Sequence, residues 1–198
     1  MLFLLNNVIV GNYFCYDYPA YLEVQIEDEY DVSAKKYGLL YSSYGIPNLV
    51  LPFFVGVLYD MYGTMLCMTL FTTFVMMGQA LIALGGFTMN FNMLLIGRFI
   101  YGIGCENQIY TIIIVEWFYH FELSLGMGLS EVLPLAASTA AGLVIPRVYD
   151  LYDEPDQCFG YTFGVGFLVT TYSFIAMILL ACLDYKMNKH DKKLLKKC

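Results

Sequence analysis

The feature that most constrains this chain is the length of its charge-free stretches. Met61–Gly97 is a run of 37 residues without Asp, Glu, Lys or Arg, and similar runs cover Tyr37–Tyr59 (23 residues) and Gln157–Leu183 (27 residues). About a quarter of the residues of a soluble domain are charged, so such runs do not suit a solvated surface. Because about 20 apolar residues cross a hydrocarbon layer about 30 Å thick, each run predicts at least one membrane span.

Charges and turn residues divide the chain into six predicted spans. The chain is 59% hydrophobic and 14% charged, which is the composition of a polytopic membrane protein. Its apolar runs are long, rich in Leu, Met and Ile, and lack strict alternation, which favours helices over barrel strands. The predicted fold class is therefore all-α, with spans at Leu2–Tyr18, Tyr37–Tyr59, Met65–Leu84, Phe91–Val115, Leu123–Pro146 and Tyr161–Leu183.

The distribution of basic residues predicts the orientation of these spans. Six of the ten Lys and Arg residues lie in the last 13 positions, at Lys186, Lys189, Lys192, Lys193, Lys196 and Lys197. The positive-inside rule places such a tail in the cytosol, and an even number of spans places the N-terminus there too. The acidic segments Glu23–Asp31 and Asp150–Asp156 then face the lumen or exterior. We therefore expect a helical bundle over residues 1–185 and a basic cytosolic tail over residues 186–198.

Four sequence blocks resemble a known family. They are Cys15–Leu22 (CYDYPAYL), Pro47–Asp60 (PNLVLPFFVGVLYD), Gly97–Glu106 (GRFIYGIGCE) and Trp117-Phe118. With these blocks the chain resembles the amino-terminal six-span half of the major facilitator superfamily, and it is most like the branch called major facilitator superfamily domain-containing protein 1. The resemblance covers nearly the whole chain. It implies a solute carrier that works by alternating access, and the branch implies a lysosomal carrier of small peptides.

Gly56-x-x-x-Asp60-x-x-Gly63 is a candidate conformational latch between the second and third spans. Glycines allow a tight turn and close helix approach, and the aspartate can meet a helix N-terminus or a basic residue. Where the family pattern has basic residues, this chain has Met61, Thr64 and Met65. A capped tight turn without a latch function is the alternative interpretation.

Ionisable residues inside the predicted spans are the candidate substrate-cavity residues. Such groups are costly within a membrane and mark a pathway or a paired site. The candidates are Arg98, Glu106, Glu131, Tyr16 and Asp17. Arg98 and Glu106 are about 12 Å apart along a helix, too far for a direct ion pair, so Arg98 needs another partner or a water-filled cavity. A structural ion network is the alternative. The related carriers have an arginine near Pro134–Leu135 that this chain lacks, which removes a partner for a peptide carboxylate.

Glycines in the fourth and sixth spans predict close helix packing. Gly97 and Gly102 flank Arg98, and Gly160 and Gly164 form a G-x-x-x-G pattern. Small residues let helix backbones approach closely. Packing within the bundle is the first expectation, and a contact with a second copy or a partner is the alternative.

The family builds its substrate site between two six-span halves, so one half cannot enclose it. Three explanations stay open: a half-carrier that pairs with itself or with a second six-span bundle, a degenerate half that serves as a structural subunit of a larger membrane complex, and a piece of a longer carrier. We expect a multi-pass membrane protein of an internal, lysosome-like membrane, in contact with the lipid bilayer. No metal, cofactor, nucleic acid or enzymatic activity is expected, because no corresponding motif occurs.

Overall fold

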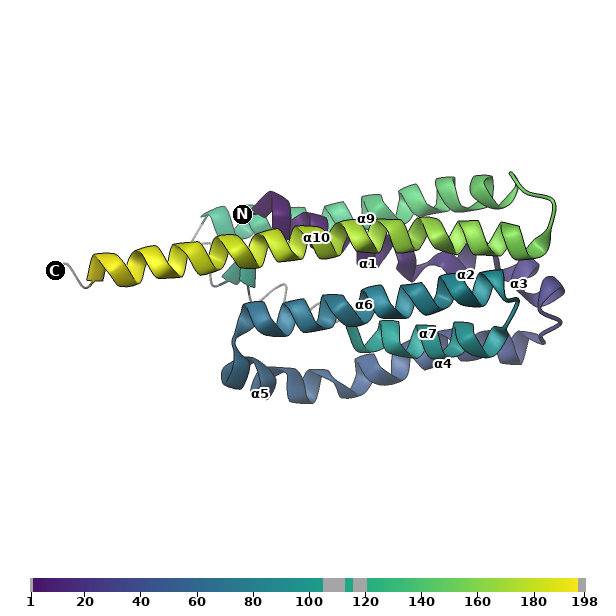
Figure 1. The fold of residues 1–198 in the computed structure, drawn as a ribbon, viewed down its shortest axis with the longest axis horizontal. Helices are drawn as coiled ribbons and strands as arrows, with labels where there is room; N and C mark the ends of the chain where they lie inside the picture. Colours follow the sequence, from purple (N-terminus) through teal and green to yellow (C-terminus); the bar gives the residue numbers. More distant parts are fainter. Residues whose placement is uncertain (1, 105–112, 116–120, 196–198) are drawn as a thin grey trace.

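The computed structural model describes residues 2–104, 113–115 and 121–195, and helices dominate this part of the chain (Figure 1). The described residues contain no strand, so the all-α prediction is confirmed. The helices are α1 (Leu2–Tyr16), α2 (Tyr18–Tyr21), α3 (Glu23–Glu29), α4 (Ala34–Val50), α5 (Pro52–Tyr62), α6 (Thr64–Phe87), α7 (Phe91–Gly104), α9 (Phe121–Tyr149) and α10 (Pro155–Leu195).

Three of these helices are long and apolar enough to cross a membrane, by length and composition: α6, α9 and α10. The pair α4 and α5 gives a fourth if it counts as one bent span. Helix α7 is a shorter apolar helix that ends where the described residues stop, and α1 has 15 residues. The count of six spans therefore stays a prediction.

The predicted span Tyr37–Tyr59 is bent by 53° between α4 and α5. Pro52, the first residue of α5, has no N–H to donate to the carbonyl four residues earlier, and Pro47 lies one turn before it. Two prolines this close explain why one apolar run forms two helices.

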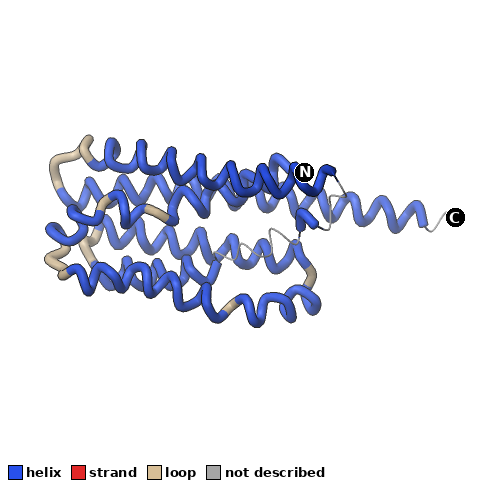
Figure 2. The backbone as a smooth tube through the Cα atoms, turned by 180° about the vertical axis from the view of Figure 1, so that it is seen from behind, coloured by secondary structure: helices blue, strands red, loops and turns tan. Residues whose placement is uncertain are grey.

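The helices pack side by side in the order α4, α7, α6, α10, α1 and α9. Figures 1 and 2 show this series folded into two rows, with α9, α10 and α1 in one row and α6, α7 and α4 in the other. Helices α6 and α10 lie in the middle of the series, while α4 and α9 are its two ends.

Two apolar clusters lie along the bundle. One gathers Leu22, Ile26, Leu40, Leu94 and Phe159, close to the two acidic segments. The other gathers Leu5, Val55, Met68, Met177 and Leu180, toward the turn between α5 and α6. We call the first end of the bundle, with Glu23–Asp31 and Asp150–Asp156, the acidic end.

The acidic end is partly helical, because Glu23–Glu29 forms α3. Tyr30, the residue after α3, donates its hydroxyl to the Gly85 carbonyl near the end of α6 (3.2 Å). Burial, together with the neighbouring Tyr149, raises the pKa of Tyr30 well above its ordinary value, so its hydroxyl stays a neutral donor. This contact closes α3 over the end of the bundle.

Candidate functional site

Arg98 is buried beside the C-terminal end of α1. Its side chain is 5% exposed, and Nη1 donates to the Tyr16 carbonyl (3.0 Å) in the last turn of α1. Its guanidinium carbon also lies 5.7 Å from the centre of the Tyr101 ring. The C-terminal end of a helix carries a partial negative charge, so it offsets part of the Arg98 charge. Among the described residues no carboxylate pairs with Arg98.

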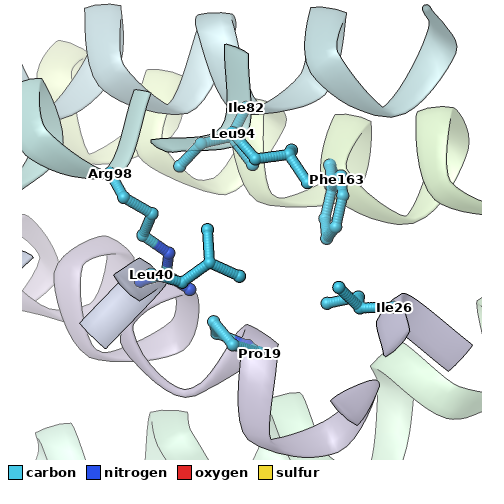
Figure 3. Close-up of a pocket in the computed structure, with 7 residues that line it drawn as sticks. All are labelled: Pro19, Ile26, Leu40, Ile82, Leu94, Arg98 and Phe163. Carbon is cyan, nitrogen blue, oxygen red and sulfur yellow. The ribbon is translucent and has the colours of Figure 1, made fainter. Parts of the chain in front are cut away.

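A small cavity lies beside Arg98 and has room for about one water molecule. Figure 3 shows Arg98 extending from its helix toward Leu40 and Pro19, between helices from different parts of the chain. The other side chains that line the cavity are apolar: Ile26, Ile82, Leu94 and Phe163. This cavity is too small for an organic solute.

Tyr101 adds a second contact between α7 and α1. Its hydroxyl donates to the Asn12 carbonyl, one turn before the Tyr16 carbonyl that accepts from Arg98. Because Arg98 and Tyr101 are three residues apart, they share one face of α7. Two donors on one helix thus meet two successive turns of the other.

Asp17 joins the end of α1 to α9. It lies between α1 and α2, and its Oδ2 accepts a hydrogen bond from the Ser138 hydroxyl. Tyr21 reinforces the junction by donating to the Ser138 carbonyl (2.9 Å). Asp17 is partly exposed, and within the described ranges no Lys or Arg pairs with it. The structure therefore gives this carboxylate a hydroxyl partner but no counter-charge.

Glu131 lies on the same face of α9 as Ser138. The two residues are seven positions apart, which is close to two full helical turns and about 10.5 Å along the axis. Glu131 is exposed, and the described side of α9 that is buried consists of Gly126, Ser130, Pro134, Ala137, Ala141 and Ile145. Asp17 and Glu131 therefore border the same side of α9.

Tyrosines of α4 pack against the end of α1 and the start of α2. Tyr16 and Tyr44 meet edge to face, with ring centres 5.0 Å apart, and both rings keep part of their surface uncovered. One turn along α4, Tyr41 is 37% exposed and its hydroxyl lies 3.5 Å from that of Tyr37. Tyr37 in turn donates to the Pro19 carbonyl (2.8 Å). We call Tyr16, Tyr41 and Tyr44 the tyrosine surface.

Ser173 is a positioning residue that the sequence did not reveal. Its hydroxyl accepts from the Gly11 N–H (3.1 Å) and donates to the Asn7 carbonyl (2.9 Å). These two backbone groups are four residues apart in α1, which is the spacing of an α-helical hydrogen bond. The Ser173 hydroxyl of α10 is therefore inserted between the N–H and the carbonyl of one such pair. A Cβ on Gly11 would lie 2.4 Å from the Ser173 oxygen, so only glycine admits this contact.

The candidate latch segment forms a turn in which the Gly63 N–H donates to the Tyr59 carbonyl. Gly63, between α5 and α6, has φ +81°, a conformation that favours glycine. Asp60 is exposed, and in the part of the chain that the structure describes it makes no ion pair or side-chain hydrogen bond. A Cβ on Gly56 would meet no atom within 4 Å. The latch function stays a prediction.

The four predicted packing glycines behave differently. A Cβ on Gly97 would lie 2.9 Å from the Gly78 carbonyl oxygen, and one on Gly102 would lie 2.6 Å from that of Tyr44. Gly160 faces the Phe87 ring. A Cβ on Gly164 would meet nothing within 4 Å, so no close contact of the described bundle requires this glycine. Glu106, the remaining candidate, lies outside the described residues.

Comparison with known proteins places this geometry in context. The family model of the Major Facilitator Superfamily matches residues 3–196. The Lysosomal dipeptide transporter MFSD1 of Mus musculus and that of Homo sapiens are each 34% identical to the chain over 187 residues, which is 90% of this chain and 40% of theirs. The protein of the same name from Danio rerio is 32% identical over 195 residues (92% and 42%). The chain thus spans about two fifths of the length of these relatives.

Proposed function

Because the chain belongs to the major facilitator superfamily, we propose that it forms one six-span half of a membrane solute carrier that works by alternating access. A second six-span bundle, from the same polypeptide or from another chain, completes the substrate cavity. Orientation with both termini in the cytosol is part of this proposal.

The observation that carries the proposal is the exposed acid on α9. Glu131 lies well inside a helix long and apolar enough to span a membrane, yet the described bundle leaves it uncovered. A charged residue facing lipid is costly, so this face of α9 needs a polar environment. A water-filled cavity between two bundles provides one, and Asp17 borders the same side.

The substrate class follows from the relatives. Their names describe lysosomal dipeptide transport, and we propose a small peptide-like solute and a lysosome-like membrane for this chain. The related carriers have an arginine near Pro134–Leu135 that this chain lacks, which removes a partner for a peptide carboxylate, so we propose that its preference among peptides differs from theirs.

Uptake of a labelled dipeptide into vesicles that contain the full natural assembly tests the proposal. Glu131→Gln should reduce uptake by about tenfold or more, because the exposed acid is lost from the cavity. Glu154→Gln, an exposed acid of the loop between α9 and α10, is the matched control and should transport normally. Equal uptake by both variants would remove Glu131 from the cavity. Absence of uptake for a panel of small solutes, with the chain held at fixed stoichiometry in a larger complex, would favour a structural subunit instead.

A further inference from the structure

We infer that Tyr18 and Gln79 form a buried polar pair that is unbonded in this conformation and bonded in another, so that the pair is a conformational switch between α2 and α6. The inference rests on the proposed function, because it assigns the two arrangements of the pair to two states of the transport cycle.

The two side chains meet at one point of the bundle, next to Gly166 of α10. A Cβ on this glycine would collide with the Tyr18 hydroxyl oxygen and would lie 2.6 Å from Gln79 Nε2. Tyr18 is 1% exposed and Gln79 is fully buried. Gly166 also lies well inside a helix that is long and apolar enough to span a membrane. Polar groups at such a place are costly, so this pair needs an explanation.

The pair contains a donor and an acceptor that are both unbonded. Within the described ranges, the Tyr18 hydroxyl and Gln79 Oε1 have no hydrogen-bond partner. The Cys15 thiol lies beside the Tyr18 hydroxyl, but a thiol is a weak partner and this one donates to the Gly166 carbonyl (3.5 Å). Gln79 Nε2 donates to the Phe163 carbonyl (3.2 Å). This conformation therefore leaves a stabilising bond from the Tyr18 hydroxyl to Gln79 Oε1 unmade.

Helix α2 is the element that moves Tyr18. It has only four residues, and non-helical residues separate it from α1 and α3. Two tyrosines tie it to other helices: Tyr37 of α4 donates to the Pro19 carbonyl (2.8 Å), and Tyr21 donates to the Ser138 carbonyl of α9 (2.9 Å). A displacement of α4 or α9 therefore changes the position of α2 and, with it, that of the Tyr18 hydroxyl.

The first test replaces each member of the pair by an apolar side chain of similar size. Tyr18→Phe removes the unbonded hydroxyl, so it favours the described arrangement and should raise the melting temperature of the full assembly by about 2–4 °C. Gln79→Met removes an unbonded acceptor and one hydrogen bond together, so its melting temperature should stay close to that of the natural protein. Because the pair is unbonded, the two effects on melting temperature should add in the double variant.

Uptake of the labelled dipeptide into vesicles should behave differently from stability. Each single variant should lower the maximal uptake rate at least threefold, because each removes the bond of the second arrangement. The double variant should be no slower than the slower single variant, since the bond is lost only once.

Thr162→Val is the matched control. Thr162 lies one turn before Gly166 on α10, is fully buried, and its hydroxyl also has no partner among the described residues. This variant should raise the melting temperature as Tyr18→Phe does and leave uptake unchanged. Slower uptake in Thr162→Val would mean that stabilisation alone slows transport and would overturn the switch.

A lower melting temperature in Tyr18→Phe, or strongly non-additive melting temperatures, would mean that the pair is already bonded and would also overturn the inference. Unchanged uptake in Tyr18→Phe would do the same. Amide exchange in α2 tests the switch without any flux: it should slow in Tyr18→Phe, and unchanged exchange would contradict the second arrangement. Absence of dipeptide uptake by the natural protein, with slower exchange in Tyr18→Phe, would contradict the proposed function alone.

Discussion

Replacing Gly78 by alanine should destabilise the bundle, whereas the same change at Gly164 should not. A Cβ on Gly78 of α6 would lie 2.4 Å from the Tyr101 nitrogen, 2.7 Å from the Tyr101 Cα and 2.8 Å from the Gly97 carbonyl oxygen. All three are backbone atoms of α7, so no side-chain rotation relieves the clash. At Gly164 the added Cβ would meet no heavy atom within 4 Å.

The size of the difference follows from two opposing effects. Overpacking a close contact typically costs about 1–3 kcal/mol, and here the two helices must separate. Alanine in place of glycine inside a helix is worth up to about 1 kcal/mol, and at Gly164 this gain is not opposed. Because the helix gain is common to both variants, they should differ in free energy of unfolding by roughly 1–3 kcal/mol. For a chain of this length about 2–4 °C of melting temperature corresponds to 1 kcal/mol. The expected gap is on the order of 5 °C.

The assay is thermal unfolding of the full protein in one detergent, followed by the loss of the monodisperse peak in size-exclusion chromatography. Gly97→Ala faces Gly78 and should melt near Gly78→Ala. Equal melting temperatures for Gly78→Ala and Gly164→Ala would refute the close approach of α6 and α7. A strong loss of stability at Gly164 would instead mean that this glycine contacts something outside the described bundle.

Two further perturbations test single contacts. Ser173→Ala removes the hydroxyl that contacts Gly11, so it should lower the free energy of unfolding by about 1 kcal/mol and speed up amide exchange at Gly11. The control is Thr171→Ala, whose hydroxyl bonds only within α10 and which should leave exchange at Gly11 unchanged. Slow exchange at Gly11 in Ser173→Ala would argue against the insertion. Gly63→Ala places a side chain at φ +81° and should lower the free energy of unfolding by about 1–2 kcal/mol, although no atom would contact the new side chain. Gly56→Ala is the control, because Gly56 is equally open but lies inside a helix. An unchanged free energy of unfolding in Gly63→Ala would mean that the turn relaxes freely.

The sequence predicts the helices well because membrane length and charge exclusion act locally. The predicted span Met65–Leu84 lies inside α6 (Thr64–Phe87), and the all-α class and the family are confirmed. The bend at Pro52 and the helix α3 were not predicted, because an apolar run does not reveal where proline breaks it and acidic residues outside the membrane are free to be helical.

The contacts of the site were harder to predict because they join residues far apart in the chain. The sequence shows that Arg98 needs a partner, but the partner is a backbone carbonyl at the end of α1, 82 residues away. The Ser173–Gly11 contact joins positions 162 apart. The only sequence signal for it is a glycine inside an apolar helix, which is common to many packing contacts.

The polar contacts also divide the bundle into a fixed part and a less fixed part. Three carbonyls of α1, at Asn7, Asn12 and Tyr16, accept from Ser173 of α10 and from Tyr101 and Arg98 of α7. Helix α1 is thus tied to both rows of the bundle.

Helix α9 is different, because its described side-chain hydrogen bonds to other helices are those of Ser138 with Asp17 and Tyr21. The rest of the contact between α9 and α1 is made by a stripe of small and apolar residues. Such a contact contains no directional hydrogen bonds that a sliding helix would have to break. A shift of α9 during transport must therefore break the hydrogen bonds that join Ser138 to Asp17 and to Tyr21.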